Sequence, residues 1–94
     1  MAWIHVRHPV ADYTKWKAVY DETAEYKRTL GWKRYQLFAV GGNRDDLLVM
    51  EEFDTREHVQ EFLDSAFLRE AMARAGVSGA PEMLVVEALE EGSR

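Results

Sequence analysis

The fold is decided by a short segment that carries apolar side chains on both of its sides, Leu47-Leu48-Val49-Met50-Glu51-Glu52-Phe53. Aliphatic and aromatic residues favour a β-strand, in which successive side chains point to opposite faces of the sheet. Leu47 and Val49 therefore face one side. Leu48 and Met50 face the other. Since a strand with one face in water alternates apolar with polar residues, we expect both faces of this strand to be covered.

Two further segments show strand character with the same two-sided pattern. Residues 32–40 precede the first segment, and the turn-rich connector 41–46 makes the pair a hairpin. Residues 82–89 form the last strand, with Met83 and Val85 opposite Leu84 and Val86. In residues 32–40, simple alternation sorts the apolar side chains into two groups: Trp32, Phe38 and Val40 on one side, and Tyr35, Leu37 and Ala39 on the other.

The segment before the hairpin predicts a strand and one long helix. Residues 1–9 read as a strand that Pro9 closes. Residues 13–30 repeat bulky side chains at helical spacing, with Asp12 placed as the cap and Gly31 as a left-handed stop. Lys27 falls within the apolar stripe of this helix. We expect its stem to lie along apolar surface and its ammonium to reach water.

The segment after the hairpin predicts a second helical region. Asp54 is placed as its cap, with Glu57 completing a capping box. Ser65 caps a continuation that Gly76 ends. Residues 77–81 are then a loop before the last strand, and the polar residues 90–94 are expected to fray.

The resulting order, β-α-β-β-α-β, is that of a ferredoxin-like α+β sandwich occupying residues 1–94 as one domain. Right-handed crossovers place both helices on one face of a four-stranded antiparallel sheet. The other face is also apolar, and residues 90–94 are too few and too polar to cover it. We therefore predict a homodimer in which two sheets pack face to face by two-fold symmetry, giving a dimeric α/β barrel.

Composition excludes several classes of function. Of the 94 residues, 12 are Lys or Arg and 17 are Asp or Glu, and a net charge of −5 disfavours nucleic-acid binding. The sequence has no cysteine, so disulfides, thiolate nucleophiles and cysteine metal sites are ruled out. No apolar run approaches the roughly 20 residues of a membrane helix, and no signal-peptide pattern follows Met1. We expect a cytoplasmic protein with no membrane partner.

Several stretches along nearly the whole chain form a recognisable set: Arg7-His8-Pro9-Val10-Ala11-Asp12-Tyr13-Thr14-Lys15-Trp16-Lys17, Tyr20-Asp21-Glu22, Glu51-Glu52-Phe53-Asp54, Phe62-Leu63-Asp64-Ser65, Leu68-Arg69-Glu70-Ala71-Met72-Ala73-Arg74-Ala75-Gly76-Val77 and Gly79-Ala80-Pro81-Glu82. With these residues the sequence resembles small dimeric α/β-barrel proteins described as antibiotic-biosynthesis-monooxygenase-like or cyclase-like. The resemblance implies the fold and the dimer. That superfamily includes cofactor-free monooxygenases of aromatic polyketides, haem-degrading enzymes, and muconolactone-isomerase-like and chlorite-dismutase-like enzymes. The matching stretches are mainly structural, so no catalytic residue is carried over.

His8 is the best single candidate for chemistry. It lies where the first strand meets the first helix, near Asp12, and an ordinary histidine pKa near 6.5 suits acid–base work. The alternative is a histidine that only satisfies backbone groups in that turn. His5 and His8 are three apart on a strand and point to opposite faces, and His58 lies in the first turn of a helix. We therefore expect no metal site, and a lone histidine is a thin basis for binding haem.

Large aromatic and cationic side chains suggest a ligand pocket between sheet and helices. Its candidate lining residues are Trp16, Tyr20, Lys27, Arg34 and Tyr35. The aromatic residues could hold a small ligand, with Lys27 and Arg34 attracting an acidic or enolate substrate. The alternative is that the aromatic residues are core and both cations are exposed. The adjacent Glu51 and Glu52 point oppositely and form no shared-proton dyad, but one of them could pair with Arg34 or Arg7.

Two functions follow from these residues and from the resemblance. The first is a cofactor-independent monooxygenase-like or cyclase-like enzyme acting on a small aromatic or polyketide-like molecule, with His8 as its catalytic residue. The second is a non-catalytic small-molecule-binding or structural dimer. A solvent-reachable cavity holding His8 with Tyr20 or Tyr35 favours the first function, and a filled interior favours the second. Neither hypothesis requires a cofactor.

Overall fold

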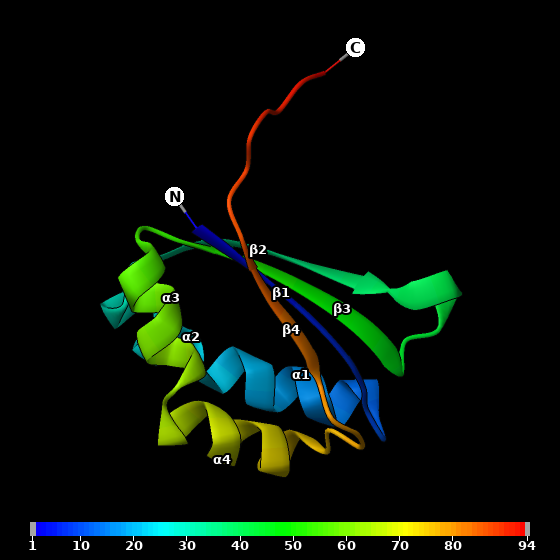
Figure 1. The fold of residues 1–94 in the computed structure, drawn as a ribbon. Coiled ribbons are helices and arrows are strands. Elements are labelled where there is room, and N and C mark those ends of the chain that lie inside the picture. The colour runs from blue at the N-terminus through cyan, green and yellow to red at the C-terminus, as the bar shows by residue number, and fades with distance from the viewer. Residues whose placement is uncertain (1, 94) are drawn as a thin grey trace.

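A computed structural model describes residues 2–93 of the chain (Figure 1). Four strands and four helices follow one another with short connections. In chain order they are β1 (Ala2–Pro9), α1 (Tyr13–Glu22), α2 (Ala24–Thr29), β2 (Trp32–Ala39), the 3₁₀ turn η1 (Val40–Gly42), β3 (Asp46–Phe53), α3 (Arg56–Leu63), α4 (Ala66–Ala75) and β4 (Glu82–Val86).

The four strands form one antiparallel sheet in the order β2-β3-β1-β4. The central β1 aligns Ile4 with Glu51 of β3 on one side and with Val85 of β4 on the other. All four helices lie on one side of this sheet (Figure 1). The chain therefore has the predicted ferredoxin-like α+β fold, in β-α-β-β-α-β order, with one face of the sheet left open.

The first helical region differs from the single helix predicted over residues 13–30. Asp12 caps α1 as expected, accepting a hydrogen bond from the Thr14 amide at 2.9 Å. The helix breaks at Thr23, whose hydroxyl donates to the Tyr20 carbonyl oxygen at 2.7 Å, and α2 starts afresh after it. A threonine hydroxyl competes with the backbone in this way. Gly31 ends the region with a φ of +79°, as predicted.

Two other local predictions also need correction. The cap of α3 is Thr55, whose hydroxyl accepts from the His58 amide at 3.1 Å, and not Asp54. The Asp54 carboxylate instead bonds the His58 ring at 2.7 Å and lies over Gly31. Ser65 caps α4 as predicted. The last strand ends at Val86, three residues before the predicted end, because from there the chain leaves the sheet (Figure 1).

A bulge in β2 changes which of its side chains face the helices. The register against β3 shifts between Trp32 and Arg34, so Trp32 lies opposite Phe53 on the helix-covered face. The predicted grouping of Trp32 with Phe38 is therefore wrong, because simple alternation assumes a strand without an extra residue. The predicted alternation of β3 and β4 is confirmed by their pairing with β1.

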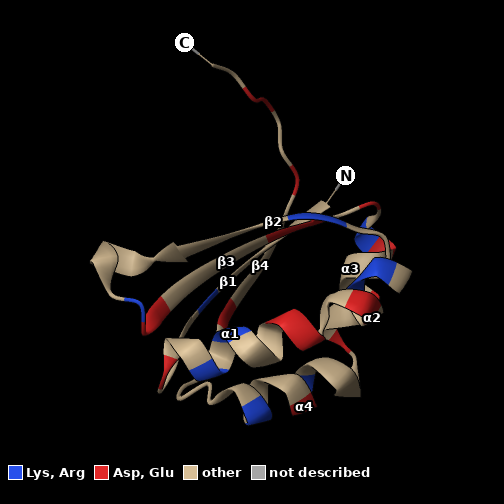
Figure 2. Ribbon diagram, turned by 180° about the vertical axis from the view of Figure 1, so that it is seen from behind, with Lys and Arg blue, Asp and Glu red and all other residues tan. Residues whose placement is uncertain are grey.

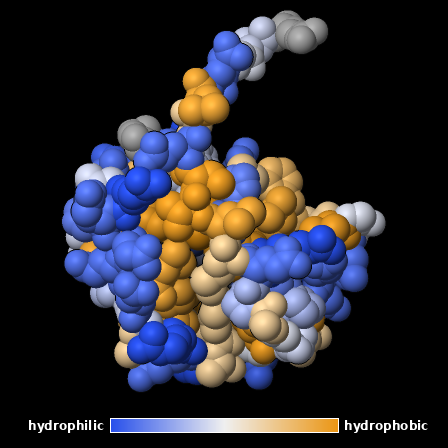
Figure 3. All heavy atoms as spheres, in the orientation of Figure 1, coloured by the Kyte–Doolittle hydropathy of each residue, from blue (hydrophilic) through white to orange (hydrophobic). Residues whose placement is uncertain are grey.

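The hydrophobic core fills the space between the sheet and the helices. Ile4, Phe53 and Val59 are fully buried there. The open face, in contrast, leaves Phe38 43% exposed and Leu84 62% exposed. Figure 3 shows apolar side chains gathered at the middle of the molecule and again at the base of the C-terminal segment. Within residues 2–93, no helix is both long and apolar enough to pass through a membrane.

Candidate active site

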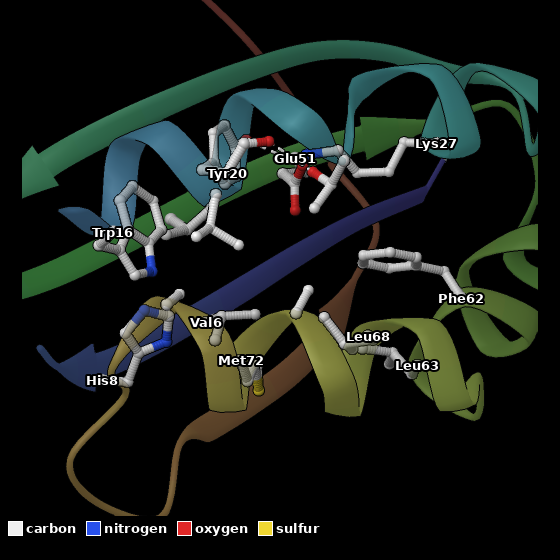
Figure 4. Close-up of a pocket in the computed structure, with 15 residues that line it drawn as sticks. Val6, His8, Trp16, Tyr20, Lys27, Glu51, Phe62, Leu63, Leu68 and Met72 are labelled. Atoms are coloured by element: carbon white, nitrogen blue, oxygen red, sulfur yellow. Dashed lines mark hydrogen bonds and ion pairs between the residues drawn. The ribbon is translucent and has the colours of Figure 1, made fainter. Parts of the chain in front are cut away.

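A small cavity lies between the helices and the sheet (Figure 4). Its volume is about 60 Å³, which holds a few water molecules. Most of its lining is apolar and comes from β1, β3, α1, α3 and α4. The polar lining residues are His8, Tyr20, Thr23, Lys27 and Glu51. These five side chains are the candidates for chemistry, because the rest of the wall offers only packing.

Lys27 is the most completely buried large side chain of the cavity wall, at 1% exposed. Its ammonium forms an ion pair with the Glu51 carboxylate, Nζ to Oε2, at 2.7 Å. The Tyr20 hydroxyl donates to the same Oε2 at 2.9 Å. The ammonium also lies 3.8 Å from the ring centre of Tyr20 and 4.3 Å from that of Trp32. We call Tyr20, Lys27 and Glu51 the buried triad.

The prediction that Lys27 reaches water is therefore wrong. Buried cations persist only where a counter-charge and hydrogen bonds replace their hydration. The break at Thr23 makes α2 a separate short helix, and Glu51 points from β3 into the same interior. Two aromatic faces complete the surroundings of the ammonium. Lys27 is thus held inside by partners that only the folded chain brings together.

Burial shifts the pKa values of two members of the buried triad, Lys27 and Tyr20. Burial lowers the pKa of Lys27, and the Glu51 carboxylate offsets part of this effect. Burial raises the pKa of Tyr20 far above its usual range, and the charge of Glu51 raises it further. Tyr20 is therefore a permanent hydrogen-bond donor at neutral pH. Because the charges of Lys27 and Glu51 cancel, this end of the cavity is polar without a net charge.

His8 occupies another part of the cavity wall, beside Trp16 (Figure 4). The two ring centres are 5.8 Å apart. His8 is 3% exposed, and within residues 2–93 neither of its ring nitrogens has a hydrogen-bond partner. Burial lowers the pKa of His8, and the charge of Asp46 opposes that shift. The imidazole is therefore neutral at pH 7 and has a free lone pair, which a general base requires.

The alternative reading of His8, a histidine that satisfies backbone groups in the turn, has no support among the described contacts. Buried polar atoms are almost always hydrogen-bonded, so an unpartnered buried imidazole calls for an explanation. Water or a ligand in the cavity can supply the missing partner, because His8 lines it.

The structure brings four of the six sequence candidates together. His8, Trp16, Tyr20 and Lys27 all line the cavity, and the Trp16 ring stacks on Tyr20 with centres 4.8 Å apart. Tyr35 stands outside the cavity, 47% exposed, with its ring against Tyr20 and Trp32.

Arg34 lies on the opposite face of the sheet from the cavity. Its Nε donates to Glu52 Oε1 at 3.0 Å, and its guanidinium lies 5.3 Å from the ring centre of Trp3. The expected pairing of one of the adjacent glutamates with Arg34 is thus confirmed, and it places Arg34 away from the candidate substrate pocket.

Sequence reasoning missed Glu51 as the partner of Lys27. The signal was present in the alternation of β3, because Glu51 shares its side of the strand with Leu47, Val49 and Phe53. A carboxylate on the core side of one strand and a lysine in the apolar stripe of a helix together indicate a buried pair.

The three histidines occupy three different places in the fold. His5 is on the open face opposite Leu84, His8 lines the cavity, and His58 bonds Asp54 at the start of α3. Within residues 2–93 no group of three or more potential ligands is placed to hold a metal ion.

Solved structures with this fold were found by comparison of backbones. SnoaB, a cofactor-independent oxygenase from Streptomyces nogalater, aligns with a TM-score of 0.77 and 18% identity over 96% of this chain and 94% of its own. A monooxygenase from the gene ActVA-Orf6 of Streptomyces coelicolor, solved in complex with the ligand nanaomycin D, aligns at 0.72 and 17% identity over 99% and 91%. A structure described as antibiotic biosynthesis monooxygenase aligns at 0.72 and 14% identity over 96% and 100%.

The chain has the fold of the antibiotic-biosynthesis-monooxygenase-like proteins. The resemblance stated from the sequence is therefore confirmed at the level of the fold. No protein-family model and no curated protein matches the sequence. Identities of 14–18% establish the fold alone, and a shared fold does not imply a shared function.

Proposed function

We propose that this chain is a cofactor-independent monooxygenase-like enzyme that oxidises a small aromatic or polyketide-like molecule in the cavity between sheet and helices. The observation that carries the proposal is His8, a buried neutral imidazole in a mainly apolar cavity wall, whose two ring nitrogens have no hydrogen-bond partner among residues 2–93. The similarity to SnoaB, itself a cofactor-independent oxygenase, supports the same class of reaction.

In the proposed reaction, His8 acts as general base. It removes a proton from an acidic C–H group of the substrate, and the aromatic rings of the substrate delocalise the carbanion. Dioxygen then takes four electrons from the substrate, so that a CH₂ group and O₂ give a C=O group and water. One oxygen atom stays on the carbon, and the other leaves as water with both hydrogens. Since the substrate supplies all the electrons, the reaction needs no cofactor.

Lys27 is proposed to stabilise the negative charge that the substrate develops. An ammonium has three N–H donors, and within residues 2–93 its one hydrogen-bond acceptor is Glu51. Donors remain for a substrate oxygen that reaches this end of the cavity. Such an interaction becomes strong once a bound substrate displaces the water from this end of the cavity. Trp16 and Tyr20 would provide the aromatic wall.

A second candidate function is a non-catalytic dimer that binds a small molecule or is purely structural. The volume of the cavity favours it, because about 60 Å³ is far below the roughly 300–1,000 Å³ of ligand pockets. The enzyme therefore requires the cavity to enlarge on binding. Met72 and Leu68 of α4 line it, and a flexible methionine side chain adapts readily to a ligand.

We propose further that the functional unit is a homodimer formed through the open face of the sheet. Leu84 and Phe38 are large apolar side chains exposed on that face. Packing the faces of two copies together by two-fold symmetry removes them from water. The buried triad and His8 lie on the other side of the sheet, so each copy would keep its own cavity.

Oxygen consumption tests the enzyme proposal. The protein is incubated in air with a panel of tricyclic anthrones, each of which has an acidic CH₂ group and forms a delocalised anion, while oxygen uptake and product are recorded. We expect one O₂ consumed per C=O group formed, and His8→Asn to lower the rate about 100-fold or more. His58→Asn, which changes a histidine outside the cavity, is the matched control and should leave the rate unchanged.

The two candidate functions give opposite results in this assay. Saturable binding of the same compounds without oxygen uptake above the buffer rate would support the non-catalytic dimer. Oxygen uptake that His8→Asn leaves intact would reject His8 as the base. For the enzyme, the rate should stay constant near neutral pH and fall only below pH 6.5, because burial lowers the pKa of His8.

A further inference from the structure

Lys27 differs from the other lysines of the chain in its surroundings. Lys15 and Lys17 lie on α1 and Lys33 lies on β2, where water reaches their side chains (Figure 2). The side chain of Lys17 is 32% exposed, whereas that of Lys27 is 1% exposed in the cavity wall. A lysine amine that loses a proton is a nucleophile, which an arginine guanidinium at the same place is not. Lys27 therefore brings a potential nucleophile into the interior.

The contacts of Lys27 provide a route for one of its protons. Glu51 Oε2 lies 2.7 Å from Nζ, and the tips of the two side chains meet at the cavity (Figure 4). Burial also lowers the pKa of Lys27, whereas the hydrogen bond to Asp21 raises the pKa of Lys17. Transfer of a proton to Glu51 gives an uncharged amine beside an uncharged carboxyl group, which removes the desolvation cost of both buried charges. The neutral amine is therefore far less costly to form at Lys27 than at Lys17.

The space beside the amine suits a small aliphatic molecule. The cavity has a volume of about 60 Å³, and Val49, Phe62 and Leu68 are among its apolar walls. At the roughly 10–15 Å³ that a water-sized group occupies, it holds about four or five non-hydrogen atoms. A molecule of that size fits the cavity as it stands, without the enlargement that a tricyclic substrate requires. A lysine amine reacts reversibly with one common group on such molecules, the carbonyl.

We propose that Lys27 forms an imine with a small aliphatic aldehyde or ketone bound in the cavity. After one ammonium proton has moved to Glu51, the lone pair of Nζ attacks the carbonyl carbon and a C–N bond forms. The carbonyl oxygen takes the π electrons and a second proton from the nitrogen, and so becomes a hydroxyl group. The C–O bond then breaks while the nitrogen lone pair forms the C=N bond, and the hydroxyl leaves as water with the proton held by Glu51.

The step leaves the charges of the buried triad as they were. The nitrogen keeps one of its three hydrogens, and the other two leave with the carbonyl oxygen as water. The product is a protonated imine, whose positive charge faces the Glu51 carboxylate as the ammonium did. No oxidant or reductant is needed, and no charge is left in the interior without its partner. This activity goes beyond the proposed function, in which Lys27 only donates hydrogen bonds, and it requires neither dioxygen nor a second copy of the chain.

Reductive trapping tests the imine. The unmodified protein is incubated near neutral pH with propanal and cyanoborohydride, which reduces an imine to a stable secondary amine, and the labelled lysines are identified by peptide mass spectrometry. We expect Lys27 to gain a propyl group at least about 10-fold faster than Lys17, because an ordinary lysine is almost entirely protonated at that pH. The rate at Lys27 should also saturate with propanal concentration, since the aldehyde binds in the cavity first, whereas the rate at Lys17 should rise in proportion.

Two variants connect the fast labelling with one side chain. Lys27→Arg keeps a positive charge opposite Glu51 but has no amine, so the chain should lose the fast phase of labelling. Lys17→Arg is the matched control and should keep that phase. Because the rates at Lys27 and Lys17 are also compared within the unmodified chain, the test stands even if Lys27→Arg does not fold.

The rates decide the outcome. Labelling of Lys27 that is no faster than that of Lys17, or that does not saturate, would overturn the proposal. Naphthaldehyde is too large for the cavity and should label Lys17 but not Lys27, and equally fast labelling of Lys27 by both aldehydes would overturn the restriction to small carbonyl compounds. Oxygen consumption reports on the enzyme proposal separately: trapping without oxygen uptake would support the imine site and reject the oxygenase, and the reverse pattern would do the opposite.

Discussion

Glu51 and Glu52 are neighbours on β3, and each is nearly completely buried, yet they serve opposite faces of the sheet. Glu51 pairs with Lys27, which is 1% exposed beneath the helices. Glu52 pairs with Arg34, whose side chain is 57% exposed on the open face. One ion pair is enclosed by its own chain, and the other still has water on one side. A single chain therefore encloses only the helix-covered face of its sheet, although its strands carry apolar side chains on both faces.

The difference has energetic consequences. Removing one partner of an enclosed ion pair leaves the other charge buried without a counter-charge. When the partner that is removed was exposed, water can take its place. Substitutions on the helix-covered face should therefore lower the free energy of unfolding strongly. Substitutions on the open face should mainly weaken the association with a second copy.

Replacement of Lys27 by methionine should cause the largest loss of stability. It leaves the Glu51 carboxylate buried without its cation, a change that costs about 3–5 kcal/mol. Urea denaturation followed by circular dichroism measures the effect.

The double variant Lys27→Met/Glu51→Gln should recover most of that loss, since the amide carries no charge and its oxygen can still accept the hydrogen bond from Tyr20. It also keeps the test valid if the single variant does not fold. A double variant as unstable as the single one would refute the account of the buried triad.

Leu84→Asp should dissociate the proposed dimer without unfolding the chain. Burial of one leucine contributes about 1.5–3 kcal/mol, and a two-fold interface contains the residue twice. The dissociation constant should therefore rise at least about 100-fold, which light scattering over a dilution series detects. Ala66→Asp, at the exposed first residue of α4, introduces the same charge as a control and should leave the dimer intact.

Arg34→Met sharpens the comparison between the two ion pairs. The guanidinium is more than half exposed, so we expect roughly half, or less, of the shift in urea midpoint caused by Lys27→Met. In 0.5 M salt, the difference in urea midpoint between Arg34→Met and the unmodified chain should become smaller still. Equal losses for the two variants would show that the faces are equally enclosed.

The smallest effect on stability should come from the histidines, because folding shifts the pKa values of His8 and His58 in opposite directions. Burial lowers the pKa of His8, and the hydrogen bond to Asp54 raises the pKa of His58. Proton NMR should therefore find His8 titrating below pH 6.5 and His58 above it.

Linkage then gives opposite signs for stability. Folding holds His8 less protonated than the unfolded chain does, so stability falls as the pH drops below 6.5 through its lowered pKa. The contribution of His58 is complete below pH 6.5 and is lost as the pH rises through its raised pKa. His8→Gln should remove only the loss of stability that occurs below pH 6.5. A His8 that titrates above 6.5 would be inconsistent with an enclosed cavity.

The sequence was sufficient where one local pattern decides the structure. The alternation in β3 predicted two apolar faces, and the caps Asp12 and Ser65 are where they were expected. Each of these features depends on residues close together in the chain, so no distant contact had to be known. The ferredoxin-like fold, with its four-stranded antiparallel sheet, followed from the order of the elements.

The sequence was insufficient where two local solutions compete. Asp54 and Thr55 are both good caps, and the choice fell to Thr55 because Asp54 bonds His58 and lies over Gly31. Lys27 was expected in water because its partner lies 24 residues away on another element. The cavity itself depends on how α4 is spaced from the sheet, which no local pattern encodes.

The mass of the chain in solution tests the central difference between the two faces most directly. Sedimentation equilibrium at micromolar concentration should give twice the 10.9 kDa of one chain, because a second copy covers the open face. A stable 10.9 kDa particle across the whole concentration range would contradict the account, since Leu84 and Phe38 would then remain in water.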